Sequence, residues 1–337
     1  MIDIAPANPR WKRRPEGSNW GEFGPDDQLG RLNLITDARR LEAVRTVRDG
    51  KSFALSLPLD YPGGEAADAA RFGPKLFATE LGGHQVYTMN LSAGDICCDD
   101  GVTMCLQYST QWDSLAHWGQ MFDTQGDGVG RPVFYNGFVA GEDIVAADRG
   151  GPKANKLGVE NMAAHGLQGR AVLVDLARTF GTGRRHCGWA DLSRAIGEQR
   201  VEVREGDFLL LHTGYGEAVM AGDRHPDEAA LGQTGAVLDG SDRDLLDWID
   251  QSGIAAICAD NPAVEEFSFA RMGHPGGLLP LHEHCIFKLG IHLGELWWLG
   301  DLADHLHQIG NRPFLLTAPP LRLTGAAGSP VTPIATL

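Results

Sequence analysis

The sequence predicts an α/β protein, and three observations support this fold class. In the second half of the chain, continuous apolar runs alternate with amphipathic stretches, as they do in βαβ units. The strand candidates are residues 169–176, 206–216 (with a turn) and 254–259, and the clearest helix candidate is 242–249. The 337 residues contain no internal repeat, low-complexity block or obvious linker. A hydrophobic content of 43% with 22% charged residues is typical of a soluble globular domain.

The net charge of −15 argues against nucleic acid or an anionic membrane surface as the binding partner. No apolar run approaches the roughly 18–20 residues that a membrane-spanning helix needs, and the first residues lack the apolar core of a secretory signal. The six cysteines show no C-x-x-C spacing, so they predict neither a thiolate zinc site nor a disulfide framework. We therefore expect a cytoplasmic protein with a small-molecule substrate.

The first 30 residues are rich in Pro, Gly, Trp and charge, which predicts an extended N-terminal arm, with a single domain in residues 31–337. Thr36 can cap a helix that ends at Gly50. This helix carries an apolar stripe formed by Leu41, Val44 and Val47. Residues 53–57 alternate like a half-buried strand.

Residues 60–83 form a long Gly/Ala/Pro-rich loop, and its length suggests a lid or an oligomer contact. Strands are expected at residues 84–91 and 103–110, with a hairpin-like turn between them. Shorter elements follow: helices at 158–162 and 192–196, and a strand at 201–203. His212 lies near the end of its predicted strand, where sites often occur, but a lone strand histidine is a weak candidate.

The run from Gln107 to His117, Gln-Tyr-Ser-Thr-Gln-Trp-Asp-Ser-Leu-Ala-His, concentrates polar groups in eleven residues. On a helix, Asp113 and His117 would share a face, because they are four residues apart. On a strand, Gln107, Gln111 and Asp113 would share a face instead. Either arrangement gathers metal-capable oxygens and an imidazole; the alternative is a buried polar turn whose groups satisfy one another.

A metal site needs ligands from more than one element, and residues 281–295 supply a second polar run with three histidines and two glutamates. An amphipathic helix with a solvated polar face would also explain this run, and we favour that interpretation for Glu283 and His292.

The first run resembles the signature of the cyclase family of kynurenine formamidase and isatin hydrolase, written H-x-G-T-H-x-D-x-P-x-H. Thr110, Asp113 and His117 match this signature, whereas Gln107 and Gln111 stand at the two leading His positions. Ser109 replaces the Gly, and Ala116 replaces the Pro. Four other segments resemble family motifs in the same order: Trp20-Gly21 with Asp27 to Gly30, residues 206–215, Leu289-Gly290-Ile291 before Glu295, and residues 328–335.

The resemblance implies the swivelling β/β/α cyclase-like fold, a mixed β-sheet with flanking helices, and a homodimer or homotetramer. It implies His117 and Asp113 as catalytic residues, and a metal held by Gln111, Asp113, His282 and Glu295, with His284 as the rival of His282. The substrate-binding candidates are Gln107, Tyr108, Thr110, Trp112, Trp118, Phe134 and Tyr135. For Trp118, Phe134 and Tyr135, a place in the hydrophobic core is an equal alternative. The resemblance implies Mn²⁺ or Zn²⁺ as the cation, with Mg²⁺ as a third candidate. Two carboxamides in place of imidazoles make the site richer in oxygen, which should favour Mn²⁺ or Mg²⁺ over Zn²⁺ and weaken the binding of any ion.

Three functional hypotheses follow. The first is a metal-dependent hydrolase that cleaves a cyclic or N-acyl amide, or a lactone, of a small aromatic or polyketide-like molecule. The second is a metal-independent cyclase, dehydratase or isomerase that uses His117 and Asp113 as an acid–base pair. The third is a non-catalytic small-molecule binding protein, which the buried ionisable groups disfavour.

Overall fold

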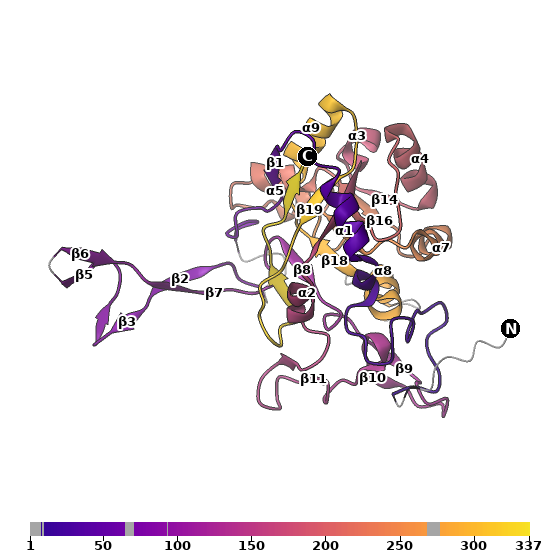
Figure 1. Cartoon of the computed structure of the whole chain (residues 1–337), viewed down its shortest axis with the longest axis horizontal. Coiled ribbons are helices and arrows are strands. Elements are labelled where there is room, and N and C mark those ends of the chain that lie inside the picture. Colours follow the sequence, from indigo (N-terminus) through magenta and orange to yellow (C-terminus); the bar gives the residue numbers. More distant parts are fainter. Residues whose placement is uncertain (1–7, 9, 65–70, 93, 268–276) are drawn as a thin grey trace.

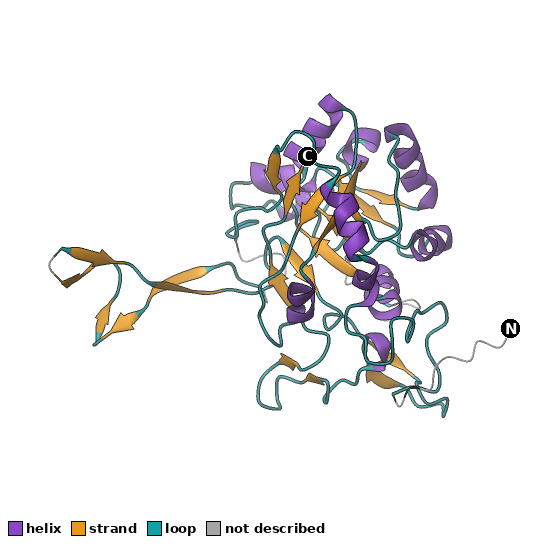
Figure 2. Cartoon of the chain, viewed as in Figure 1, coloured by secondary structure: helices purple, strands orange, loops and turns teal. Residues whose placement is uncertain are grey.

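The computed structural model describes residue 8 and residues 10–64, 71–92, 94–267 and 277–337, and it confirms the α/β prediction. A nine-stranded mixed sheet has the strand order β1-β21-β19-β13-β15-β17-β18-β8-β20, and Figures 1 and 2 show helices packed around it. The central strands β13 (Gln168–Asp175), β15 (Phe208–His212), β17 (Ala256–Ala259) and β18 (His292–Glu295) are parallel. The other pairs in this sheet are antiparallel.

The two antiparallel wings extend the parallel centre. One wing contains β19 (Phe314–Thr317), β21 (Ile334–Thr336) and β1 (Ser52–Ala54). The other contains β8 (Gln111–Asp113) and the edge strand β20 (Gly328–Pro330). Because β8 pairs with β18, the two polar runs of the sequence lie on neighbouring strands.

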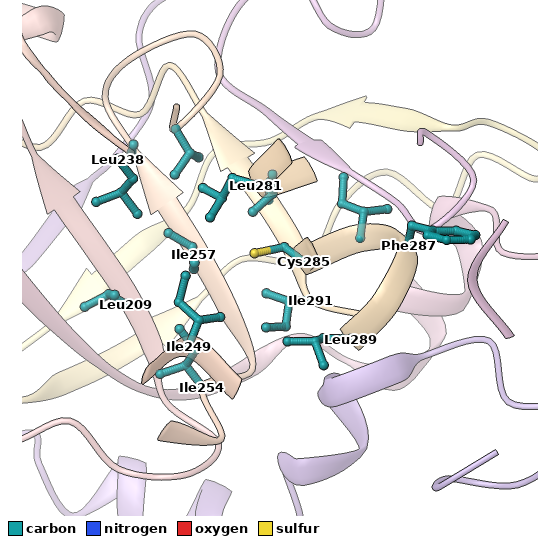
Figure 3. Packing of buried hydrophobic residues seen from close by; sticks show 14 of the residues in the cluster. Leu209, Leu238, Ile249, Ile254, Ile257, Leu281, Cys285, Phe287, Leu289 and Ile291 are labelled. Carbon is teal, nitrogen blue, oxygen red and sulfur yellow. The ribbon is translucent and has the colours of Figure 1, made fainter. Parts of the chain in front are cut away.

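The central strands are buried on both faces, which explains their continuous apolar sequences. Val172, Val174, Leu209 and Leu211 belong to one core cluster, and the alternating residues Ala171, Leu173, Phe208 and Leu210 belong to another. Helices α4 (Trp189–Gln199), α7 (Arg243–Ser252) and α8 (Pro280–His282) and the π-helix η4 (Glu283–Leu289) contribute to the first cluster, part of which Figure 3 shows. The second receives η1 (Gly30–Leu34), α2 (Val159–His165) and α9 (Gly300–Ile309).

The remaining elements are short. The helices are α1 (Asp37–Val44), α3 (Leu176–Phe180), α5 (Tyr215–Ala221), α6 (Glu228–Leu231) and the 3-10 turn η2 (Tyr135–Gly137). Outside the main sheet, the body of the described structure contains three strand pairs: β9 (Gln120–Phe122) with β10 (Arg131–Val133), β11 (Ile144–Val145) with β12 (Lys153–Ala154), and β14 (Arg185–Cys187) with β16 (Ala236–Leu238). Within the described residues, none of the helices is both long and apolar enough to cross a membrane.

A branched β-ribbon projects from the body at the left of Figures 1 and 2. We call it the β-arm and define it as residues 72–92 and 94–104. Its strands are β2 (Lys75–Ala78), β3 (Glu80–Leu81), β4 (His84–Gln85), β5 (Met89–Ser92), β6 (Asp95–Cys97) and β7 (Asp100–Thr103). The predicted loop 60–83 was therefore wrong in its last part, which is ribbon, and residues 65–70 of that loop lie outside the described residues.

Several local predictions need correction. The predicted strand 84–91 is two short strands, residues 104–110 form turns, and no strand forms at 201–203. Thr36 does cap α1, because its Oγ1 accepts a hydrogen bond from Arg39 N at 3.4 Å. However, α1 ends at Val44, and the predicted apolar stripe is exposed, with Leu41 at 59% and Val44 at 50%; Ala43 is the buried residue. The apolar periodicity of the sequence therefore does not predict the buried face of α1, because Ala43 is the one side chain of this helix that is buried in the core.

The described part of the N-terminal arm lies against the body. Trp20 is fully buried, and its Nε1 donates to Phe287 O at 2.7 Å. Asn19 donates from its backbone N to Lys288 O at 3.2 Å and from Nδ2 to Leu289 O at 2.8 Å. The carbonyl groups of Phe287, Lys288 and Leu289 lie in the last turn of the π-helix η4, where the helix has no further N–H groups to donate to them. The division of the chain at residue 30 stays a prediction.

Gly290 is expected to be the least replaceable helix-ending glycine near the site. Its φ is +61°, and an added Cβ would lie 2.6 Å from Gly30 Cα and 2.8 Å from the Tyr135 ring. Gly166, which ends α2 at φ +70°, has open space around it. Left-handed strain alone costs about 1–2 kcal/mol, so Gly166→Ala should cost that much, and Gly290→Ala about 3–4 kcal/mol because the clash adds to it. Urea unfolding of both variants tests this, and equal losses would contradict it.

Candidate functional site

The pairing of β8 with β18 brings the predicted metal ligands together. The register places Gln111 opposite Glu295 and Asp113 opposite Leu293. Gln111 and Asp113 point to the same side of β8, since they are two residues apart. His282, at the end of α8, approaches from the helix layer: one ligand atom each of Asp113, His117 and His282 lie within 4.8 Å of one another.

Four buried oxygen atoms in this group have no hydrogen-bond partner among the described residues. They are both carboxylate oxygens of Asp113, Oε1 of Glu295 and Oε1 of Gln111. The Gln111 Nε2 donates to the other Glu295 oxygen at 2.8 Å. Burying carboxylate and amide oxygens without a hydrogen-bond donor is costly, and a bound cation would relieve this cost, as would a proton on Asp113.

Glu265 holds the His282 imidazole in place. Its Oε1 lies 2.9 Å from His282 Nδ1 and accepts from His282 N at 2.8 Å, and its Oε2 accepts from Leu281 N at 2.9 Å. His282 Nε2 then faces Glu295 Oε1 at 3.4 Å. Sequence reasoning missed Glu265, because no local pattern relates it to a histidine seventeen residues away.

The electrostatics of His282 follow from these partners. Burial disfavours the charged imidazole, but the Glu265 and Glu295 carboxylates outweigh burial and raise the pKa of His282 to about 10. A carboxylate behind a metal-binding histidine is a common arrangement, since it sets which ring nitrogen faces the metal.

Asp113 and His117 have pKa values displaced in opposite directions. Burial, together with the neighbouring Glu295 carboxylate, raises the pKa of Asp113 well above its usual range, against the opposing charges of His282 and Arg71. Burial and the positive charges of His282 and Arg71 lower the pKa of His117 to about 3. His117 Nδ1 lies 3.6 Å from Asp113 Oδ1. At neutral pH, His117 is therefore a neutral imidazole.

Three of the predicted substrate-binding residues lie at or near this group. The Trp118 ring makes an edge contact with the His282 ring at 5.4 Å between centroids, and its buried Nε1 has no partner within the described chain. The Gln107 carboxamide lies against Gly328 of β20, the residue paired with Asp113. Phe134 packs beside Gly119, immediately after Trp118.

The structure does not bring Tyr108, Thr110, Trp112 and Tyr135 to the site. The Tyr108 hydroxyl accepts from Gly63 N at 3.1 Å, and Thr110 Oγ1 donates to Leu296 O and accepts from Leu57 N. Trp112 points to the other face of β8, where its Nε1 donates to Ala318 O at 2.8 Å. Tyr135 is fully buried against Gly290, with its hydroxyl 3.4 Å from Asp27 Oδ2. These side chains support the backbone around the site.

The other histidines of residues 281–295 lie elsewhere. His284 Nε2 is 3.1 Å from Leu246 O on α7, so His282, not His284, faces Asp113. His292 was predicted on a solvated helix face, and that prediction was wrong: it is buried on β18, with its ring nitrogens 3.2 Å from Asp113 O and 3.3 Å from Leu29 O. The helix ends at Leu289, earlier than the polar pattern suggested.

A second polar group lies at the carboxyl ends of the parallel strands. His212 Nδ1 is 2.9 Å from Asp175 and its Nε2 is 2.9 Å from Glu217, while Asp260 accepts from Thr213 and Gly214 backbone N–H groups. Burial opposes the charged imidazole, but the bonds to Asp175 and Glu217 raise the pKa of His212 to about 11. Because both ring nitrogens are engaged, this group braces the strand ends.

This charged His212 predicts a pH-dependent stability. Because folding raises the pKa of His212 from 6.5 to about 11, the charged imidazole contributes its full stabilisation below pH 6.5. This contribution is lost as the pH rises towards 11. The unfolding free energy should therefore fall by up to about 1.4 kcal/mol per pH unit above pH 6.5, and His212→Gln should flatten this fall. Urea unfolding at several pH values measures both slopes, and parallel slopes would refute the assignment.

The residues of the first group fit a divalent cation. They combine one carboxylate, two imidazoles and the unpartnered oxygens of Gln111 and Glu295 in a buried space. Three carboxyl groups, those of Asp113, Glu295 and Glu265, meet the imidazoles of His117 and His282 in this space. A divalent cation would add positive charge among these groups.

Comparison with known proteins places this geometry in context. The cyclase family model, described as "Putative cyclase", matches residues 9–266. A crystal structure of a novel cyclase is similar over 96% of this chain and 100% of its own, with 32% identity and a TM-score of 0.78. Isatin hydrolase A from Labrenzia aggregata is 14% identical with a TM-score of 0.55, covering 89% and 98% of the two chains. Isatin hydrolase A from Ralstonia solanacearum is 15% identical with a TM-score of 0.53, covering 89% and 97%. Among curated proteins, none matches the sequence.

Proposed function

Because the chain belongs to the cyclase family, we propose that it is a metal-dependent hydrolase. Its substrate would be a cyclic or N-acyl amide, or a lactone, of a small aromatic or polyketide-like molecule. The observation that carries the proposal is the set of four buried, unpartnered oxygens of Gln111, Asp113 and Glu295 beside His282 and His117 in the described structure. The similarity in fold to isatin hydrolases adds support for this type of chemistry.

Asp113, His282 and Glu295 would hold the cation, with Gln111 Oε1 as a neutral ligand. Oxygen-rich ligands favour Mn²⁺ or Mg²⁺, and imidazole also suits Zn²⁺, so Mn²⁺ is our first candidate. A divalent cation in this position supplies Lewis acidity and a more acidic water. Gln111 contributes in a second way, because its Nε2 keeps Glu295 oriented towards His282.

His117 is the group that would move the proton. Its low pKa keeps the imidazole neutral, so one ring nitrogen has a free lone pair through which a proton can be transferred. Nδ1 faces Asp113, which leaves Nε2 to exchange the proton with the substrate. The unpartnered Trp118 Nε1 and the Gln107 carboxamide are the groups we assign to substrate orientation, and Phe134 would add apolar surface near them.

His282→Ala and His284→Ala form a matched pair, since the two histidines are two residues apart and only His282 faces Asp113. After purification without added metal or chelator, wild type and His284→Ala should carry near-stoichiometric metal by elemental mass spectrometry. His282→Ala and Asp113→Asn should lose it, together with amide or lactone hydrolysis. Metal retained in Asp113→Asn, or lost equally from both histidine variants, would reject the ligand set.

Glu265→Gln should weaken metal binding without unfolding the protein. The carboxamide oxygen can still accept from His282 N and from its ring Nδ1, but the NH2 group cannot accept from Leu281 N, and the charge behind the His282 ring is lost. Removing such a supporting carboxylate typically lowers metal affinity about 10–100-fold. Competition with a metal-binding dye measures the affinity, and circular dichroism checks the fold. Unchanged affinity would show that Glu265 does not tune His282.

One observation favours a metal-independent alternative. Asp113 with a raised pKa and His117 with a lowered pKa form an acid and a base 3.6 Å apart, a combination that suits ring closure, dehydration or isomerisation. Exhaustive chelation separates the two proposals. Turnover that survives chelation but is lost in His117→Gln would favour the metal-independent pair over the hydrolase.

A further inference from the structure

We propose that the candidate site binds substrates that carry a carboxylate, and that Arg71 is the residue that recognises this group. The inference rests on the proposed function and deepens it, because it names the substrate class of the same site. Three observations carry it: the fixed position of Arg71 beside Gln107, its lack of an acidic partner among the described residues, and a second unused donor at the site.

Arg71 is held at two points against the segment that carries Gln107. Its side chain is held because Nη1 donates to Gln107 O at 3.0 Å. The backbone of the next residue is held as well: Phe72 O accepts from Cys105 N at 3.1 Å, and Phe72 N donates to Cys105 Sγ at 3.3 Å. The guanidinium group therefore has a defined position at the root of the β-arm.

This position is at the edge of the candidate site. The Gln107 carboxamide lies against Gly328, the cross-strand partner of Asp113. The charge of Arg71 also reaches the site. Burial is the main cause of the low pKa of His117, and the Arg71 charge lowers this pKa further. Burial raises the pKa of Asp113, and the Arg71 charge acts on it in the opposite direction.

Arg71 makes no ion pair with any residue that the structure describes. One N–H group of its guanidinium is bonded to a described atom, whereas the group carries several. Other half-buried or buried arginines do have such partners, as Arg31 has Asp250 and Arg170 has Asp207. The planar guanidinium fork matches a carboxylate in shape and charge. The unused donors of Arg71 therefore indicate a carboxylate from outside the chain.

A second unused donor borders the same site. Trp118 Nε1 is buried and has no partner within the described residues, and its ring contacts the His282 ring. The oxygens without partners beside it belong to Gln111, Asp113 and Glu295, and oxygens suit a cation. The donors therefore remain for the substrate, which has to supply the acceptors that bind them.

The acidic groups of the site limit the charge that the substrate can carry. The carboxyl groups of Asp113 and Glu295 lie in the site, and any negative charge on them opposes a second anion. A phosphate ester carries about −2 charge at neutral pH, so it would be opposed more than a carboxylate is. The rings of Trp118 and Phe134 suit an aromatic body. The substrate class is therefore an aryl amide or lactone with a carboxylate away from the bond that is cleaved.

Calorimetric titration with benzoate and benzamide tests this assignment, because the two probes match in size and differ in charge. Benzoate should bind wild type and Arg194→Gln at least about tenfold more tightly than benzamide; Arg194, on α4, is the control for the loss of one positive charge. Arg71→Gln should lose the difference, and Arg71→Lys should keep part of it. Benzamide affinity and metal content should be the same in all four proteins.

Three outcomes would overturn the proposal. The first is equal binding of benzoate and benzamide by the wild type. The second is a benzoate affinity that is unchanged in Arg71→Gln, as direct binding to the cation would give. The third is loss of the metal in Arg71→Gln, which would show that Arg71 acts through the metal-binding group.

Hydrolysis of 4-acetamidobenzoate and acetanilide, two amides that differ only in the carboxylate, separates this inference from the proposed function. Wild type should hydrolyse the first with the lower KM, and Arg71→Gln should raise that KM about 10–100-fold with little change in kcat. If neither amide is cleaved but Arg71 still governs benzoate binding, the hydrolase proposal fails and the ligand class stands. Cleavage of both amides with equal KM values would overturn the ligand class and leave the hydrolase proposal intact.

Discussion

The candidate site depends on the antiparallel pairing of β8 with β18. This pairing sets Gln111 directly opposite Glu295, so that the amide can donate to one carboxylate oxygen and leave the other free. It also places Asp113 on the same side of β8, two residues along. A slip of one residue would turn Asp113 towards the core that holds Trp112. The register is specified because that opposite face is fully buried and apolar.

The second requirement is the placement of His282, which comes from contacts far along the chain. Glu265 binds the imidazole and the first backbone N–H groups of α8, while Asn19 and Trp20 bind the last carbonyls of the π-helix that follows. π-helical turns are rare and often occur at functional sites. Here the wider turn is held at both ends by residues from other segments, and Gly290 allows the chain to reverse into β18.

The two carboxamides at the leading histidine positions have separate roles. Gln111 supports Glu295 and retains a free oxygen, so it can replace an imidazole as a neutral donor. Gln107 lies further out, against β20, and is linked through its carbonyl to Arg71 at the root of the β-arm. Gln107 thus lies between the site and the root of the β-arm.

The sequence by itself determined the family, the α/β class and most of the polar residues that meet at the site. The buried strands at β13, β15 and β17 could be predicted because a continuous apolar run has few other uses. Asp113, His117, His282 and Glu295 could be identified because they stand in motifs. The tertiary structure alone decided which residues converge. It excluded His284, buried His292 and turned Trp112 away, and it introduced Glu265, because each outcome depends on contacts between segments distant in sequence. The β-arm also required the structure, since short strands with scattered glycines show the same local pattern as a loop.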